Sequence, residues 1–411
     1  MRLGAFLGFA SIASKLGLSR TRMGNGLATV QFFIYGRQEC TQKGWEKAKR
    51  SYGSPDPLDL CDLSGRVMLV TGANSGIGFE IAQFAASRGA RTYMLCRNAE
   101  RAEAARAKIV SAAATRNCSA DVHVLLGDTG LRTDMERCAA EFCSREKSLD
   151  ALVCNAGVMA VPDARTPDGF DVQAQVNHLS HFLLTKLLMP SLEAAAAARG
   201  EARVVQHSSG ARKPNRRRPG SDDLVAEYFE RRPPKALGGD GVGACFGRYH
   251  QTKLANTAFA IALHSKLAAA GSRVKSVCAE PGVASTALQR NTSSASPRFN
   301  RCLFAAVGFA MTSCSGGHVQ SAADGACPLI VAAFDARTGS GDLWMPSKHI
   351  PGKKVSVHGT PARSIEGGKP TATHQWIVEK FDSEALTLSL ENQATVWAAS
   401  ESAVGETWAV P

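Results

Sequence analysis

The sequence lacks several features that would place it in a special structural class. It has no run of about 18 apolar residues, the length that a membrane-spanning helix needs. Its 12 cysteines include no Cys-x-x-Cys pair, so neither a disulfide framework nor a metal site is predicted, and we expect most thiols to be reduced and buried. No internal repeat has the spacing of a solenoid. These absences predict a globular protein in a reducing compartment.

Acidic residues are absent from the start of the chain. No Asp or Glu precedes Glu39, whereas five Lys or Arg residues stand there among Ser, Gly and Leu. A basic, acid-poor start is typical of an organelle transit segment, and an amphipathic helix resting on a membrane or on the protein body is an equal alternative. We therefore expect residues 1–38 to be a targeting or membrane-associated segment of an intracellular protein.

The whole chain is basic, with a net charge of +12. The excess is spread out except at Arg212–Arg218, a cluster that could contact phospholipid headgroups or form a solvated loop, which we favour. No aromatic residues accompany it, so nucleic acid is not an expected partner. A cleft that binds a phosphate-rich ligand would also explain a basic chain.

Short apolar runs alternate with helical patterns from residue 67 onward. The expected strands are Val67–Thr71, Thr92–Cys96, Val122–Leu126, Ala151–Cys154, Val204–His207 and Val274–Cys278. The expected helices are Gly76–Arg88, Ala99–Ala114, Leu131–Arg145, Phe170–Ala197 and Tyr249–Ala270. Such alternation predicts an α/β protein with a mostly parallel sheet and helices on both faces, a doubly wound Rossmann fold.

Two regions interrupt this alternation. Residues 211–247, rich in Arg, Pro and Gly, predict a long surface insertion. After residue 287 we expect an edge strand at Leu343–Met345 and helices at Thr373–Phe381 and Gln393–Ser402. The expected domains are the segment 1–38, a helical lead-in 39–64, the Rossmann domain 65–345 and a C-terminal extension on the substrate side, 346–411.

A glycine-rich turn follows the first predicted strand and opens the first predicted helix. That context is the one in which a dinucleotide site occurs, because glycines let backbone amides approach a pyrophosphate and the helix N-terminus attracts its charge. A turn without a ligand is the alternative. The residues expected to bind the cofactor there are Gly72, Asn74, Ser75, Gly76, Ile77 and Gly78.

Tyr249 and Lys253 stand one helical turn apart and therefore project from the same face. The pKa of a free tyrosine, about 10, is too high for proton transfer near neutrality, and a neighbouring ammonium lowers it. Together with the glycine turn, this pair predicts hydride transfer to or from a nicotinamide, with Tyr249 moving the proton.

Six motifs, in order from about residue 65 to 288, resemble those of the short-chain dehydrogenase/reductase family. They are TGxxxGIG at Thr71–Gly78, NAG at Asn155–Gly157, the helix asparagine Asn177, the serine Ser209, YxxxK at Tyr249–Lys253, and PGxxxT at Pro281–Thr286. The forty positions between Ser209 and Tyr249 exceed the family's spacing, which puts the local substrate pocket in doubt.

The resemblance implies a role for each matched position. Tyr249 exchanges the proton with the substrate oxygen, Lys253 contacts the nicotinamide ribose, and Ser209 orients the substrate oxygen. Asn177 positions a water that links Lys253 to solvent. Further residues implied in cofactor binding are Asp128, Thr129, Asn155, Ala156, Gly157, Pro281, Gly282 and Thr286.

Within the family, different segments resemble different branches. Tyr249–Asn256, Asn177–Thr185 and Val396–Gly405 resemble the retinol dehydrogenase-like branch. Phe33–Trp45 and Leu63–Arg66 resemble the lead-in of dehydrogenase/reductase member 12-like proteins.

The end of the second strand bears on the cofactor. An acidic residue there would hold the ribose 2′-hydroxyl of NAD, but this chain has Arg97, whose planar fork suits a 2′-phosphate. NADP(H) is therefore favoured over NAD(H), with stacking of Arg97 on the adenine as the alternative.

Two functions are consistent with these residues. The first is an NADP(H)-dependent oxidoreductase that acts on a small lipophilic carbonyl or alcohol; the second is a nicotinamide-binding regulatory or scaffold protein with little turnover. A peripheral membrane contact is expected from the N-terminal segment, and the oligomeric state is left open. His178 and His181 lie one helical turn apart, but no third ligand follows, so we expect them to pack in the core rather than bind metal.

Overall fold

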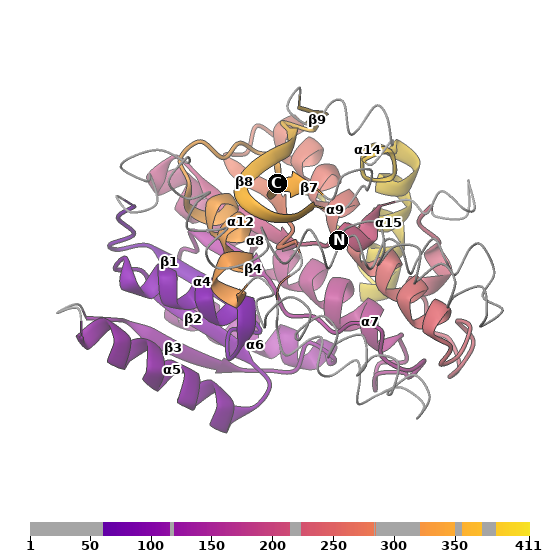
Figure 1. Cartoon of the computed structure of the whole chain (residues 1–411), viewed down its shortest axis with the longest axis horizontal. Helices are drawn as coiled ribbons and strands as arrows, with labels where there is room; N and C mark the ends of the chain where they lie inside the picture. The colour runs from indigo at the N-terminus through magenta and orange to yellow at the C-terminus, as the bar shows by residue number, and fades with distance from the viewer. Residues whose placement is uncertain are drawn as a thin grey trace, which may run out of the picture.

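The computed structural model describes residues 61–115, 119–213, 223–282, 284, 321–349, 356–371 and 384–411 (Figure 1). The expected segment 1–38 and nearly all of the lead-in 39–64 lie outside this part, as does the expected helix Thr373–Phe381. None of the helices in these ranges has the length and apolarity that crossing a bilayer requires.

One sheet organises the described chain, and nine strands contribute to it there in the order β3-β2-β1-β4-β5-β6-β7-β8-β9. All pairings from β3 to β7 are parallel, and the last two are antiparallel. The strands are β1 Val67–Thr71, β2 Arg91–Cys96, β3 Val122–Leu126, β4 Ala151–Cys154, β5 Ala202–His207, β6 Val274–Ala279, β7 Leu343–His349, β8 Ser356–Glu366 and β9 Lys369–Pro370.

The order of strands reverses between β1 and β4, which makes this junction the topological switch point of a doubly wound sheet. Ligands of such sheets bind outside the carboxyl ends of the strands at this point. Every residue of β1 and of β4 is buried, as expected for parallel strands covered on both faces. The predicted Rossmann fold is confirmed.

Helices cover both faces of the sheet. They are α4 Gly76–Ser87, α5 Ala99–Ala114, α6 Arg132–Arg145, α7 Val172–Ala174, the π-helix η1 Gln175–Leu179, α8 Ser180–Arg199, α9 Val242–Ala269, α12 Ala322–Phe334, α14 Ala385–Leu388 and α15 Leu390–Val404, with two short 3₁₀ turns, η2 Gly210–Arg212 and η3 Ala226–Phe229. One apolar core lies beneath α4, α5 and α12, a second lies beneath α6, α8, α9 and α15, and a smaller third cluster joins α9 to β6, β7 and β8. Figure 1 shows α12, drawn in orange, beside the indigo α4, although nearly 240 residues separate them.

The C-terminal third differs from its prediction in two ways. A strand does begin at Leu343, but it is not the edge, because β8 and β9 extend the sheet beyond it. Helix α12 was not expected; it is buried along nearly its whole length, and Gly325 and Pro328 within it are residues that disfavour a helix interior.

The expected insertion 211–247 is not simply a surface loop. Among its described residues, Leu224 and Phe229 belong to the core. Arg212 and Lys213, expected in a solvated basic loop, are buried. The guanidinium of Arg212 pairs with Glu280 and, at 2.7 Å, with Glu384. Carboxylates distant in the sequence therefore neutralise the start of this cluster, while Pro214–Arg218 lie outside the described residues.

Candidate active site

A cavity of about 530 Å³ opens at the carboxyl ends of β1, β2, β4 and β5, within the size range of ligand pockets. The glycine turn and the Tyr249–Lys253 pair line the same cavity, although about 170 residues separate them in the sequence. Predicted residues on its wall are Gly72, Asn74, Ser75, Gly76, Ile77, Gly78, Arg97, Asp128, Thr129, Asn155, Ala156, Gly157, Ser209, Tyr249, Lys253, Pro281 and Gly282. Asn177 lies behind this wall, fully buried, and Thr286 lies outside the described residues.

The glycine turn forms a cradle that side chains would fill. Gly72 has a φ of +66°, and a Cβ added to it would come within 3.0 Å of the backbone of Ala156. A Cβ on Gly78 would lie 2.5 Å from the Gly72 carbonyl oxygen and would also collide with the Asn155 amide. The N-terminus of α4 opens onto this cradle, and the side chain of its N-cap, Ser75, makes no capping hydrogen bond. The arrangement fits the pyrophosphate of a dinucleotide.

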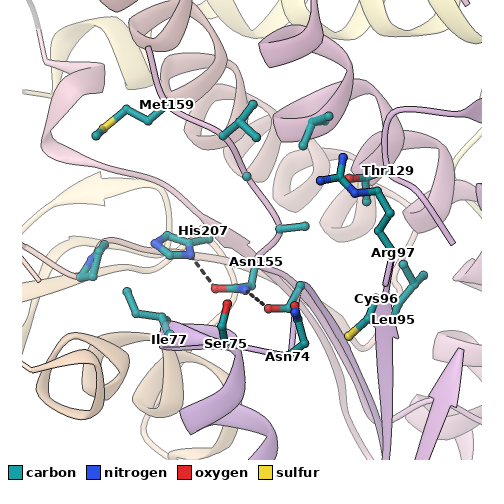
Figure 2. A pocket seen from close by; sticks show the side chains of 18 of the residues that line it. Asn74, Ser75, Ile77, Leu95, Cys96, Arg97, Thr129, Asn155, Met159 and His207 are labelled. Carbon is teal, nitrogen blue, oxygen red and sulfur yellow. Dashed lines mark hydrogen bonds between the residues drawn. The ribbon is translucent and has the colours of Figure 1, made fainter. Parts of the chain in front are cut away.

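Asn155 connects the glycine turn with the end of β5 (Figure 2). Its Nδ2 donates to the carbonyl oxygen of Thr71 at 2.9 Å, and its Oδ1 lies 2.9 Å from Nδ1 of His207. The hydroxyl of Thr71 accepts hydrogen bonds from the backbone amides of Asn155 and Ala156, both at 2.9 Å. The loop after β4 is therefore fixed against the loop after β1.

At the other end of the cavity, Arg97 follows β2 and Asp128 follows β3. The Arg97 side chain is 75% exposed, and its Nη1 lies 3.5 Å from the Asp128 carboxylate. The backbone amide of Gly130 donates to that carboxylate at 2.8 Å. An exposed ion pair of this length contributes little stability, so the guanidinium is available to another anion.

Tyr249 and Lys253 project from α9 toward the cavity, with Nζ of Lys253 5.7 Å from the centre of the Tyr249 ring. Lys253 Nζ donates to the carbonyl oxygen of His207 at 2.9 Å. The hydroxyl of Ser208 donates to the Lys253 carbonyl oxygen at 3.0 Å, which ties α9 to the end of β5.

Asn177 lies in the π-helix η1, a type of irregularity that is frequent at functional sites. Its Oδ1 accepts from the backbone amide of Val158 at 2.7 Å. Its Nδ2 donates to the Val158 carbonyl oxygen at 2.9 Å and to the Thr252 hydroxyl at 3.0 Å. The side chain thus links the loop after β4 to the helix that carries Tyr249 and Lys253.

Burial shifts both members of the pair away from their charged forms. It raises the pKa of Tyr249 to about 12, the negative charge of Glu280 adds to this, and a hydrogen bond from Ser209 opposes it. Burial also lowers the pKa of Lys253 to about 8. The pKa of Tyr249 therefore moves opposite to the direction expected from the sequence, because desolvation of the phenolate outweighs the hydrogen bond from Ser209. At neutral pH the phenol keeps its proton.

The two candidate metal ligands have other partners. His178 lies 3.1 Å from Asn256 Oδ1 and 2.8 Å from the Ser400 hydroxyl, and burial lowers its pKa to about 3. His181 lies 2.9 Å from the Thr71 hydroxyl, and burial lowers its pKa to about 4. Both are core histidines, and no cluster of potential metal ligands occurs among the residues that the structure describes.

Several residues of the cavity wall were not predicted. His207 stands two positions before Ser209, and only its place at the end of a strand could have indicated it. Arg101, in the first turn of α5, stands four positions after Arg97, so a search for a second cation near the first would have found it. Others are Cys96, Asn98, Val158, Met159, Val172 and Ala284.

The chain is similar in sequence to known proteins over the region that contains most of the sheet. Residues 66–218 match the family model of the short chain dehydrogenases. Human retinol dehydrogenase 12 is 37% identical over 232 residues, which cover 56% of this chain and 65% of that protein. The short-chain dehydrogenase/reductase drtF of Aspergillus calidoustus is 34% identical over 261 residues, 61% of this chain and 77% of that protein. The match thus spans less than two thirds of the retinol dehydrogenase.

Solved structures share the fold. A putative uncharacterized protein from Mycobacterium paratuberculosis has a TM-score of 0.54 at 26% identity, covering 85% of this chain and 97% of that one. L-sorbose reductase from Gluconobacter frateurii, solved with NADPH and L-sorbose, has a TM-score of 0.52 at 17% identity, covering 73% and 98%, which shows the fold alone. The chain belongs to the short-chain dehydrogenase/reductase family of oxidoreductases, and part of its sequence is similar to retinol dehydrogenases.

Proposed function

We propose that this protein transfers a hydride between NADP(H) and a lipophilic carbonyl or alcohol, with Tyr249 as the general acid or base. The observation that carries the proposal is the single cavity in which a glycine cradle and the Ser209, Tyr249 and Lys253 side chains meet. A binding site alone would need no proton-transfer group beside the cradle.

The chain's own residues would act as follows in reduction. Tyr249 holds a proton on its phenol oxygen and passes it to the substrate oxygen. Ser209 hydrogen-bonds the phenol and thereby stabilises the phenolate left behind. Lys253, held against β5 by the His207 carbonyl, places a cationic group beside that phenolate. The bound dinucleotide would supply the hydride chemistry.

The preference for NADP(H) rests on the positively charged side chains that lie near the end of β2. Arg97 and Arg101 both line the cavity there, and no carboxylate occupies the position after the strand. Asn98 is occupied as the N-cap of α5, where its Oδ1 accepts from the Arg101 amide at 2.8 Å. Two guanidinium groups favour a 2′-phosphate, whereas a ribose diol would be better held by an acid.

The lipophilic character of the substrate is supported by two observations. Met159, Val172 and Val176 give the cavity an apolar wall on the side of the loop after β4. Relatives at about 37% identity are named retinol dehydrogenases, and retinol is a lipophilic alcohol. The apolar stretch Leu303–Met311, which could cover such a substrate, lies outside the described residues.

A direct test is NADPH oxidation by the purified full chain with a panel of lipophilic aldehydes and ketones, including retinal. Loss of NADPH absorbance that depends on one of these substrates supports the proposal. Tight binding of NADPH without turnover of any panel member, in either direction, favours the regulatory or scaffold alternative.

A further inference from the structure

His207 contacts residues of both motifs that line the cavity, through its ring to Asn155 and through its carbonyl oxygen to Lys253. It stands at the end of β5, two residues before Ser209, and lines the cavity together with Tyr249 and Lys253. Figure 2 shows the ring beside Asn155, on the cavity side of the sheet. A dinucleotide that binds the glycine cradle with its pyrophosphate and reaches Tyr249 with its nicotinamide would lie in the cavity that His207 lines.

Several hydrogen bonds hold His207 in place. Its carbonyl oxygen accepts from Lys253 Nζ at 2.9 Å and from Asn256 Nδ2 at 3.0 Å. Its ring nitrogen Nδ1 lies 2.9 Å from the Oδ1 of Asn155. Backbone and ring are thus both fixed before any ligand arrives, which lowers the entropic cost of a contact with one.

The hydrogen bonds of Asn155 determine the tautomer of this histidine. Nδ2 of Asn155 donates to the carbonyl oxygen of Thr71 at 2.9 Å, so its Oδ1 must face His207. If the amide were reversed, Oδ1 of Asn155 would face the carbonyl oxygen of Thr71, and two acceptors would lie in contact without a hydrogen. His207 Nδ1 therefore carries the hydrogen and donates it, and Nε2 is an acceptor.

Charge and burial keep the ring neutral. Burial and the positive charge of Lys253 lower the pKa of His207 well below its ordinary value, and His181 adds to the effect. In the described part of the chain, no donor forms a hydrogen bond with Nε2. A neutral imidazole acceptor therefore stands on the wall of the cavity.

We propose that His207 is a cofactor-contacting residue, whose Nε2 accepts a hydrogen bond from the nicotinamide half of the bound dinucleotide. The donor is either the carboxamide amino group or a hydroxyl of the adjacent ribose. This inference rests on the function proposed above. In this proposal His207 binds the nicotinamide half of the dinucleotide, whereas the glycine cradle binds the pyrophosphate.

Two substitutions distinguish the contributions of the two ring nitrogens to cofactor binding. His207→Asn keeps an amide where Nδ1 lies and removes the atom at the position of Nε2, whereas His207→Gln returns a polar atom to that position. Calorimetric titration of the full-length variants with NADPH measures binding without turnover. We expect Asn to weaken NADPH binding about 3- to 10-fold, the effect of one lost hydrogen bond, and Gln to bind within about threefold of wild type.

Fragments and analogues locate the contact. Adenosine 2′,5′-bisphosphate, which lacks the nicotinamide half, should bind wild type and both variants equally. If the loss in His207→Asn disappears with the 3-acetylpyridine analogue of the cofactor, the donor is the carboxamide; if it persists, the donor is the ribose.

Other results would contradict either the role of His207 or the proposed function. No loss of NADPH binding in His207→Asn, or an equal loss for the adenosine fragment, would overturn the role of His207. Failure of wild type to bind any nicotinamide dinucleotide would instead contradict the proposed function. If a variant does not fold, ¹⁵N-histidine spectra of wild type decide, because we expect one unprotonated Nε2 signal to shift when NADPH is added. The absence of that shift would contradict the contact.

Discussion

The buried guanidinium of Arg212 donates a hydrogen bond to the carbonyl oxygen of Ser209, at 3.1 Å. The same guanidinium pairs with Glu280, which precedes the Pro281–Gly282 turn, and with Glu384 at the start of the C-terminal helices. One cation thus connects the Ser209 loop, the loop after β6 and the C-terminal segment. None of the three side chains is more than 1% exposed.

Replacement of Arg212 should therefore be strongly destabilising. Arg212→Met leaves Glu280 and Glu384 buried without their main cation, and breaking a buried pair in this way costs about 3–5 kcal/mol. Urea unfolding measures the loss. Arg106→Met, on the exposed face of α5, is the matched control and should change stability by less than about 0.5 kcal/mol. Similar stability of the two variants would show that the buried cluster does not hold the loops together.

Gly78 should not tolerate a methyl group. Gly78→Ala places a Cβ against the Gly72 carbonyl and the Asn155 amide, so the cradle must open. We expect loss of NADPH binding by calorimetry, by at least about tenfold. Gly243→Ala is the control, since nothing lies within 4 Å of its added Cβ, and alanine there should leave binding unchanged. Unchanged binding in Gly78→Ala would mean that the pyrophosphate does not use this turn.

Arg97 should distinguish NADPH from NADH. A charge-assisted contact contributes about 1.5–3 kcal/mol, so Arg97→Ala should weaken NADPH binding about 10- to 100-fold and NADH binding by less than about threefold. Arg106→Ala, in α5 and absent from the cavity wall, should affect neither. An equal loss for both cofactors would favour stacking of Arg97 on the adenine.

Much of this site could be anticipated because its motifs are local. Parallel strands buried on both faces appear as continuous apolar runs, so β1 and β4 lie where the sequence predicted them, and the partly exposed edge strand β3 does so as well. Helix α9, however, begins at Val242, seven residues before the predicted start at Tyr249. The prediction missed these residues because glycines, which disfavour helices, are frequent there. Residues whose roles depend on distant partners were beyond such reasoning. Arg212 meets Glu384, 172 positions away, and the pKa of Tyr249 depends on a burial that its spacing from Lys253 does not reveal.

Burial of Lys253 predicts a pH dependence of stability. Its pKa is about 8 in the folded protein against 10.5 for an ordinary lysine, so between these values the unfolded chain binds more protons. The contribution of this group to the free energy of unfolding should therefore rise with pH across that window, by about 1 kcal/mol per pH unit. Lys253→Met removes the group. The difference in stability between wild type and variant should shift in favour of wild type from pH 8 to pH 10, and a constant difference would contradict the lowered pKa.

The most direct test of the account is Tyr249→Phe, measured for both NADPH binding and turnover of the best lipophilic carbonyl substrate. The phenyl ring preserves the packing and removes only the proton donor, which should reduce kcat by about 10²–10⁴-fold and leave the dissociation constant of NADPH within about threefold. Retention of kcat near the wild-type value, with cofactor binding intact, would contradict the assignment of Tyr249 as the group that transfers the proton.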